Sequence, residues 1–262
     1  MRLPCGAECL IRGDVTKPVL VLLHGVGSDA SGWDFQLREF ESHFRTAAWN
    51  LPGYGGSIPC NGFTFPFLVK FLKNSLEELK IEKAHFVGHS FGGMLLQEFV
   101  REYPDSVKSM VFYATSPAFG KSDSKWQKEY LNKRLKPLEN GETLEELAPK
   151  MIRSMTGENP EPGGMELALK SVKGVSKDAY IQALKCMVGF DGRDNLSRLN
   201  LPVLLVAAEK DPNAQPLMME KMASKIPGAR FVCLPKVGHL AHLENPKSFH
   251  QVLNEFYESI EK

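Results

Sequence analysis

The stretch that decides the fold of this chain is Gly88-His89-Ser90-Phe91-Gly92-Gly93. It follows a short apolar run at residues 84–87, typical of a buried strand, and it precedes a helical pattern at residues 91–103. Glycine at positions 88 and 92 allows a sharp strand-to-helix turn whose neighbours pack closely around an exposed serine. A Gly-x-Ser-x-Gly match alone is common by chance, but the flanking strand and helix make Ser90 a candidate nucleophile.

Short β-rich runs alternate with helical patterns over much of the chain. The expected strands are residues 18–23, 46–49, 84–87, 108–113, 203–207 and 230–234, and the expected helices are residues 65–80, 91–103, 215–225 and 246–260. The first strand is apolar throughout, which suits a strand that is buried on both faces. This alternation predicts an α/β fold with a mostly parallel central sheet flanked by helices.

The alternation stops between residues 116 and 199, where helical patterns dominate and no convincing strand occurs. Candidate helices are residues 124–135, 143–155, 163–172 and 177–187, and a Pro- and Gly-rich loop spans residues 157–164. We expect a helical cap inserted between two strands. The predicted division is a first core part at residues 1–118, the cap at residues 119–195 and a second core part at residues 196–262. We expect this cap to be mobile and to control substrate choice.

The composition is that of an ordinary soluble globular protein. In 262 residues, 32 basic and 31 acidic side chains leave a net charge of +1, which indicates neither a nucleic acid nor a membrane partner. The apolar runs, such as Val19–Leu23, are too short to span a bilayer, and the first residues lack a secretory signal pattern. Five cysteines without a C-x-x-C pair predict reduced thiols in a cytoplasmic protein. We expect no metal site, since no second pair follows Cys5 and Cys9, and a homo-oligomer is left open.

Candidate acid and base residues follow the last two expected strands. Glu209 and Asp211 both lie at the sheet edge where ligands gather, and we favour Asp211 because it sits at the loop apex before a proline. His239 follows Gly238, which frees the loop to bring the imidazole towards the serine. His242 competes as the base, but it lies closer to the next helix, and we expect it to be structural or to line the pocket.

The loop that closes the first strand is His24-Gly25-Val26-Gly27. A His-Gly pair lets the backbone turn tightly over the centre. The amide of Val26 is one candidate donor to a developing oxyanion, and the amide of Phe91 at the start of its helix is the other. We expect the imidazole of His24 to tie neighbouring loops together rather than to act as a base.

Together these segments resemble the α/β-hydrolase fold over nearly the whole chain. The segments that carry the resemblance are His24-Gly25, residues 50–57, the turn around Ser90, residues 209–212 and Gly238-His239. Residues 32–36, 226–230 and 244–246 are similar to those of the 3-oxoadipate enol-lactonase and small carboxylesterase group. The resemblance implies a serine hydrolase that needs no cofactor and cleaves a small carboxylic ester or lactone. It would use a triad of Ser90, His239 and Asp211 and form an acyl-enzyme.

Two other classes of function stay open. One is another serine-dependent member of the fold, namely a C–C bond hydrolase of β-diketone type, a cofactor-free haloperoxidase-like esterase or an acyltransferase. The other is a non-catalytic binding protein of the hormone-receptor sort. We favour ester or lactone cleavage because the residues near the turn around Ser90 are largely apolar and offer no cation to stabilise a carbanion. Arg153 and Arg193 of the cap are the exceptions, since either could reach the pocket.

Substrate binding is expected to involve the loop at residues 24–27 and apolar residues of the cap. The predicted substrate-binding residues are Gly25, Trp33, Trp126, Met151 and Met187. Phe119, Met155 and Phe190 are further candidates, although any one of these apolar residues could instead pack the interior of the cap.

Overall fold

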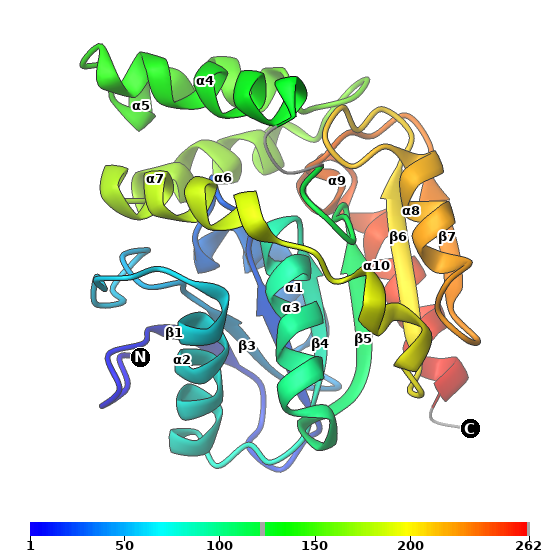
Figure 1. Cartoon of the computed structure of the whole chain (residues 1–262). Coiled ribbons are helices and arrows are strands. Elements are labelled where there is room, and N and C mark those ends of the chain that lie inside the picture. The colour runs from blue at the N-terminus through cyan, green and yellow to red at the C-terminus, as the bar shows by residue number, and fades with distance from the viewer. Residues whose placement is uncertain (121–123, 261–262) are drawn as a thin grey trace.

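The computed structural model describes residues 1–120 and 124–260 (Figure 1). Within these residues, one sheet has seven strands in the order β1-β3-β2-β4-β5-β6-β7. The strands are β1 (Cys9–Arg12), β2 (Val19–Leu23), β3 (Arg45–Trp49), β4 (Ala84–His89), β5 (Val107–Tyr113), β6 (Val203–Ala208) and β7 (Arg230–Leu234). Strand β1 is antiparallel to β3, and all the other neighbours are parallel. The expected mostly parallel sheet is therefore confirmed.

Helices flank both faces of this sheet. The core helices are α1 (Asp34–Phe40), α2 (Phe65–Glu78), α3 (Phe91–Glu102), α8 (Pro216–Ala223), α9 (Ala241–Glu244) and α10 (Pro246–Ile260). Helix α2 packs beside α3 on one face, and α1 packs beside α10 on the other (Figure 1). The short helical turns are η1 (Ala30–Trp33), η2 (Pro104–Ser106), η3 (Met187–Gly189) and η4 (Arg193–Arg198).

Four helices separate β5 from β6 and lie over the carboxyl ends of the strands (Figure 1). They are α4 (Lys125–Glu139), α5 (Leu144–Arg153), α6 (Pro162–Lys173) and α7 (Lys177–Cys186). Helix α5 begins with a capping box, in which the side chains of Thr143 and Glu146 each accept a hydrogen bond from the backbone amide of the other residue. Residues 121–123 of the expected cap lie outside the described part of the chain, and the division into core and cap stays a prediction.

The sequence patterns missed β1 and α1. Strand β1 has only four residues, so it shows little alternation, and it forms because Cys9 to Arg12 pair in register with β3. Helix α1 has seven residues, about two turns, which is too short for a clear helical period. Helix α4 also continues past the expected end at residue 135 and ends at Glu139, with Pro137 inside its last turn.

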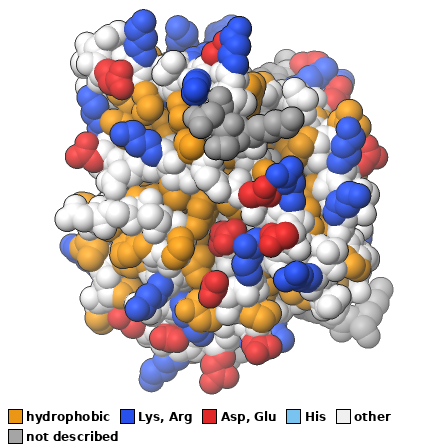
Figure 2. Space-filling view, viewed as in Figure 1, with side chains coloured by type: hydrophobic (Ala, Val, Ile, Leu, Met, Phe, Trp, Pro, Cys, Tyr) orange, Lys and Arg blue, Asp and Glu red, His pale blue; other side chains and the backbone are white. Residues whose placement is uncertain are grey.

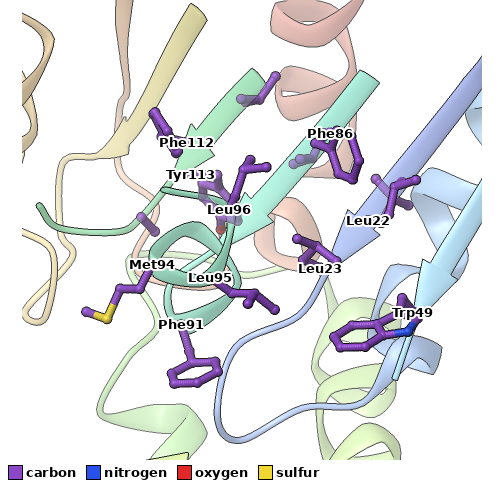
Figure 3. Close-up of a cluster of buried hydrophobic side chains, with 14 of the residues drawn as sticks. Leu22, Leu23, Trp49, Phe86, Phe91, Met94, Leu95, Leu96, Phe112 and Tyr113 are labelled. Carbon is purple, nitrogen blue, oxygen red and sulfur yellow. The ribbon is translucent and has the colours of Figure 1, made fainter. Parts of the chain in front are cut away.

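The buried core lies on both faces of the sheet, and one part of it lies between the sheet and α3, directly behind the turn that carries Ser90. Strand β2 is buried along most of its length, as the continuous apolar run predicts. Figure 3 shows part of the buried cluster, with side chains of β2, β3, β4 and β5 drawn around the first turns of α3. The labelled members of this cluster include Leu22, Leu23, Phe86, Phe112 and Tyr113 from the strands and Phe91, Met94, Leu95 and Leu96 from the helix. This packing fixes where β4 ends and α3 begins.

The surface carries charges of both signs. Figure 2 shows basic and acidic side chains interspersed over the visible face, with hydrophobic side chains gathered beneath the helical layer. Within residues 1–120 and 124–260, no helix combines the length and the apolar character that crossing a bilayer would require. The cytoplasmic location stays a prediction.

Candidate active site

Ser90 occupies a strained turn between β4 and α3. Its φ of 52° and ψ of −114° lie in a region that residues other than glycine rarely adopt. Its amide donates to the carbonyl of Tyr113 at 2.9 Å, and Thr115 Oγ1 donates to its carbonyl at 2.6 Å. The last residue of β5 and the segment that follows this strand therefore hold the backbone of Ser90 on both sides. Such strain, about 1–3 kcal/mol, is concentrated at functional sites.

The glycines around Ser90 are required by close packing. A Cβ atom at Gly88 would lie 2.6 Å from the carbonyl oxygen of Gly92. A Cβ at Gly92 would overlap the carbonyl oxygen of Leu23, which confirms that a side chain fits at neither position. At Gly93 it would lie 2.6 Å from Cβ of Thr115, so the third glycine of the motif also serves the turn.

Asp211 and His239 form a buried pair at the carboxyl end of the sheet. His239 Nδ1 lies 2.7 Å from Asp211 Oδ2, and the aspartate side chain is fully shielded from solvent. Asp211 Oδ1 accepts from the amides of Asn213 at 2.7 Å and Ala214 at 3.0 Å. Burial raises the pKa of Asp211, but the charge and hydrogen bond of His239 and the two amides outweigh it, so the net pKa is lowered. The carboxylate thus stays ionised, and His239 Nε2 remains for another partner.

The competing carboxylate, Glu209, lies outside this arrangement. It is exposed, forms a salt bridge with Lys210 at 3.2 Å and accepts the amide of Lys236 at 2.7 Å. The geometry therefore joins His239 to Asp211 and leaves Glu209 at the surface.

Two cavities meet at Ser90 and His239. The larger has a volume of about 320 Å³ and the smaller about 70 Å³, and both are lined by Ser90, Tyr130, Met187, Asn213 and His239. Among the residues predicted to bind substrate, Trp126 lines the larger cavity, Gly25 and Met151 line the smaller, and Met187 lines both. Of the further candidates, Phe119 lines the larger cavity and Met155 the smaller.

Four expectations are corrected by these positions. Trp33 is 1% exposed and packs against His242 with a ring-centroid distance of 4.6 Å, behind the site rather than in either cavity. Phe190 lines a separate groove beside α2. Arg153 is exposed, and Arg193 is exposed and paired with Asp191 at 2.5 Å. Neither arginine is among the described residues that line the two cavities.

His24 holds the peptide group that carries the Val26 amide. Its Nε2 accepts the amide of Leu51 at 3.1 Å, so the ring proton resides on Nδ1, which donates to Gly25 O at 2.8 Å. Burial lowers the pKa of His24 to about 4, so the ring is neutral near neutral pH. With the Gly25 carbonyl held, the trans peptide directs the Val26 amide to the opposite side. The structural role of His24 is therefore to fix the orientation of the peptide group between Gly25 and Val26.

A cluster of buried side chains, Tyr113, His89 and His242, supports the backbone of the loop that carries His239. Tyr113 Oη donates to the His239 carbonyl at 2.9 Å, and His89 Nε2 lies 3.0 Å from the same oxygen. His242 Nδ1 lies 3.2 Å from Tyr113 Oη, and burial lowers the pKa of His242 to about 3. Burial and the neighbouring imidazoles also hold the pKa of His89 well below its usual value. These neutral rings position the His239 backbone, and His242 is among neither set of cavity-lining residues.

Glu244 joins the loop of His239 to the segment after α5. Its carboxylate accepts the amides of Gly157 at 2.7 Å, Gly238 at 2.9 Å and Leu240 at 3.1 Å. The His239 amide also donates to Met155 O at 2.7 Å. Gly238 does not adopt a positive φ; a Cβ there would overlap this same Met155 oxygen. The glycine before His239 therefore permits close contact with the helical layer, rather than loop freedom as the sequence suggested.

We expect Glu244→Gln to destabilise the fold by about 2 kcal/mol, because one carboxylate oxygen becomes an NH₂ group that faces buried amide donors. Thermal unfolding should show a melting temperature lower by roughly 6 °C. Glu158→Gln is the matched control, since Glu158 is an exposed carboxylate of the same region that pairs with Lys210 at 3.4 Å. Equal melting temperatures for the two variants would contradict this role of Glu244.

The sequence patterns did not single out Tyr130 and Arg134. Both lie on α4 and line the smaller cavity, and Arg134 Cζ stacks 3.5 Å from the centroid of the Tyr130 ring. The signal was present in the spacing, because Trp126, Tyr130 and Arg134 recur every four residues and so share one helix face. A cation therefore reaches the smaller cavity, from Arg134 and not from Arg153 or Arg193, the two arginines considered from the sequence.

Comparisons with known proteins agree with this architecture. Residues 18–246 match the family model described as alpha/beta hydrolase fold. The 3-oxoadipate enol-lactonase 1 of Acinetobacter baylyi is 25% identical over 255 residues, covering 96% of this chain and 92% of that protein. The pimeloyl-[acyl-carrier protein] methyl ester esterase of Hamiltonella defensa is also 25% identical, with 91% and 92% covered.

Among solved structures, a thermophilic esterase from Thermogutta terrifontis superimposes with a TM-score of 0.85 at 25% identity, covering 98% of this chain and 94% of that chain. The chain belongs to the alpha/beta hydrolase fold family. The fold and the resemblance predicted from the sequence are confirmed.

Proposed function

We propose that this protein is a serine hydrolase that cleaves a small carboxylic ester or lactone. One observation carries the proposal. The strained Ser90 and His239 line the same cavity, and His239 Nδ1 is hydrogen-bonded to the buried Asp211 at 2.7 Å. The similarity to an enol-lactonase and to methyl ester esterases supports the same class of reaction.

In the proposed mechanism, His239 Nε2 accepts the proton of Ser90 Oγ as the oxygen attacks the substrate carbonyl. Asp211 keeps the other imidazole proton on Nδ1 and stabilises the imidazolium that forms. The Val26 and Phe91 amides receive the oxyanion, and each donor contributes on the order of 3 kcal/mol. Phe91 is the first residue of α3, where an amide has no partner within the helix.

Collapse of this intermediate expels the alcohol oxygen, which takes the proton from His239, and leaves an acyl group on Ser90. Water then enters, gives its proton to His239 and attacks the acyl carbon. The acid is released as the serine regains its proton. Every group required is a side chain or backbone amide of this chain.

We expect Asp211→Asn to lower kcat by about 10⁴-fold with little change in fold, because the amide favours the wrong imidazole tautomer. Glu209→Gln is the matched control and should change kcat by less than threefold. The readout is initial rates on methyl and p-nitrophenyl esters, with circular dichroism as the folding check. Similar losses in both variants would mean that Asp211 is not the acid of the site.

Substrate class is tested by comparing kcat/KM for p-nitrophenyl acetate and butyrate, an enol-lactone and a vinylogous 1,5-diketone. The proposal expects the best ester or lactone to exceed the diketone. The diketone is included because C–C cleavage requires a group that stabilises a carbanion, and Arg134 supplies a cation that the sequence patterns did not single out. A diketone rate tenfold above the best ester or lactone, about 1.4 kcal/mol in the transition state, would favour C–C hydrolysis instead.

A further inference from the structure

Arg134 brings a positive charge to the smaller cavity, beside the residues proposed for catalysis. Helix α4 crosses above the carboxyl edge of the sheet (Figure 1), and Arg134 lines the same 70 Å³ cavity as Ser90 and His239. Its Nη2 donates to Asn213 Oδ1 at 3.2 Å, and Asn213 in turn donates its amide to Asp211. The side chain is therefore anchored at a fixed place relative to the proposed triad.

The guanidinium has no anionic partner within the protein. In residues 1–120 and 124–260, no carboxylate forms an ion pair with Arg134, and its hydrogen bonds go to Asn213 Oδ1 and to the Tyr130 carbonyl. A guanidinium has five N–H donors, so about three remain for another group. The nearby Asp211 carboxylate is shielded and already accepts from His239 and two amides.

The surroundings favour an anion at this position. Apolar side chains line much of the smaller cavity, namely Met151, Met155, Leu184 and Met187. Tyr180 also lines it, and burial raises the pKa of its hydroxyl, which stays neutral and cannot balance the charge. Arginine remains protonated in proteins, and a half-buried charge is stabilised when a counter-ion arrives. Planar guanidinium also matches the two oxygens of a carboxylate.

The sizes of the two cavities suggest how a substrate is divided between them. The smaller cavity, of about 70 Å³, leaves room for the smaller part of a substrate. The larger cavity, about 320 Å³, accepts the bulkier part of the molecule. Ser90 and His239 line both, so the reacting carbonyl lies where the two cavities meet.

We propose that the substrate carries a carboxylate in addition to the ester or lactone bond, and that Arg134 binds this carboxylate in the smaller cavity. The inference rests on the proposed function for the bond that is cleaved. It concerns recognition, and the proton transfers are those already described.

The test compares esters that differ only in this charge. The substrates are monomethyl esters of the straight-chain dicarboxylic acids from succinate to pimelate, each paired with the methyl ester of its ω-amide. The amide has the shape of the carboxylate without its charge. For at least one chain length, we expect kcat/KM of the wild type to favour the carboxylate by tenfold or more.

Variants of Arg134 test whether this residue causes the preference for the carboxylate over the amide. Arg134→Gln should reduce the carboxylate-to-amide ratio to below about twofold, whereas Arg134→Lys should retain part of it because the charge remains. Lys133→Gln is the matched control, since it removes an exposed charge from the next position of α4 and should keep the wild-type ratio. Melting temperatures show that each variant is folded.

Binding gives a readout that does not depend on turnover. Calorimetric titration of Ser90→Ala with glutarate should show binding that is weakened at least tenfold when Arg134→Gln is added. A wild-type ratio near one with measurable ester cleavage would overturn the inference and leave the proposed function standing. A ratio that survives Arg134→Gln, or equal losses on both esters, would also overturn it. Arg134-dependent binding of glutarate without cleavage of any ester or lactone would support the anion site and overturn the proposed function.

Discussion

Replacing Ser90 with alanine is expected to lower kcat/KM for ester cleavage by at least about 10⁴-fold, because the proposed acyl-enzyme forms on Ser90 Oγ. This loss corresponds to about 5.5 kcal/mol of transition-state stabilisation. The fold should survive, since the contacts that hold the turn come from the backbone of Ser90, through Tyr113 and Thr115.

Ser116→Ala is the control for that experiment. Ser116 lines the larger cavity with Ser90, but its hydroxyl donates to the carbonyl of Ala118 at 2.6 Å and lies outside the strained turn. We expect this variant to lose less than tenfold in kcat/KM. Comparable activity in Ser90→Ala and the wild type, with matching circular dichroism, would refute Ser90 as the nucleophile.

The second large effect is expected from His239→Gln, which should also reduce kcat by about 10⁴-fold or more, because the serine loses its base. His242→Gln is the matched comparison. His242 is buried against Tyr113 and Trp33, so its replacement should lower the melting temperature while reducing kcat by less than about a hundredfold. Steady-state rates and thermal unfolding of both variants separate the two roles. If His242→Gln is the more damaging to kcat, the base has been assigned to the wrong histidine.

The sequence was most informative where local patterns decide local structure. The glycines at 88 and 92 predicted the turn around Ser90 because their positions leave no room for a Cβ atom. The apolar run Val19–Leu23 predicted a buried strand because burial on both faces requires such a run. The choice of Asp211 over Glu209 rested on loop position, and the structure joins Asp211 to His239.

The sequence was least informative where tertiary contacts decide. Trp33 follows the loop at residues 24–27 in the chain, yet its ring packs inwards against His242, so proximity in sequence to that loop did not predict where the side chain lies. Glu244 accepts three amides from two segments about 80 residues apart, and no short-range pattern encodes that contact. Arg134 required knowing which face of α4 turns towards the cavity, which depends on how the helix packs over the sheet.

The proposal that Ser90 is the nucleophile is tested most directly by covalent labelling of the protein with a fluorophosphonate, followed by intact-mass measurement and peptide mapping. We expect one phosphonyl group per chain, attached to Ser90 Oγ, absent from Ser90→Ala and formed far more slowly in His239→Gln. Failure to label the folded wild-type protein, or attachment at a residue other than Ser90, would contradict it.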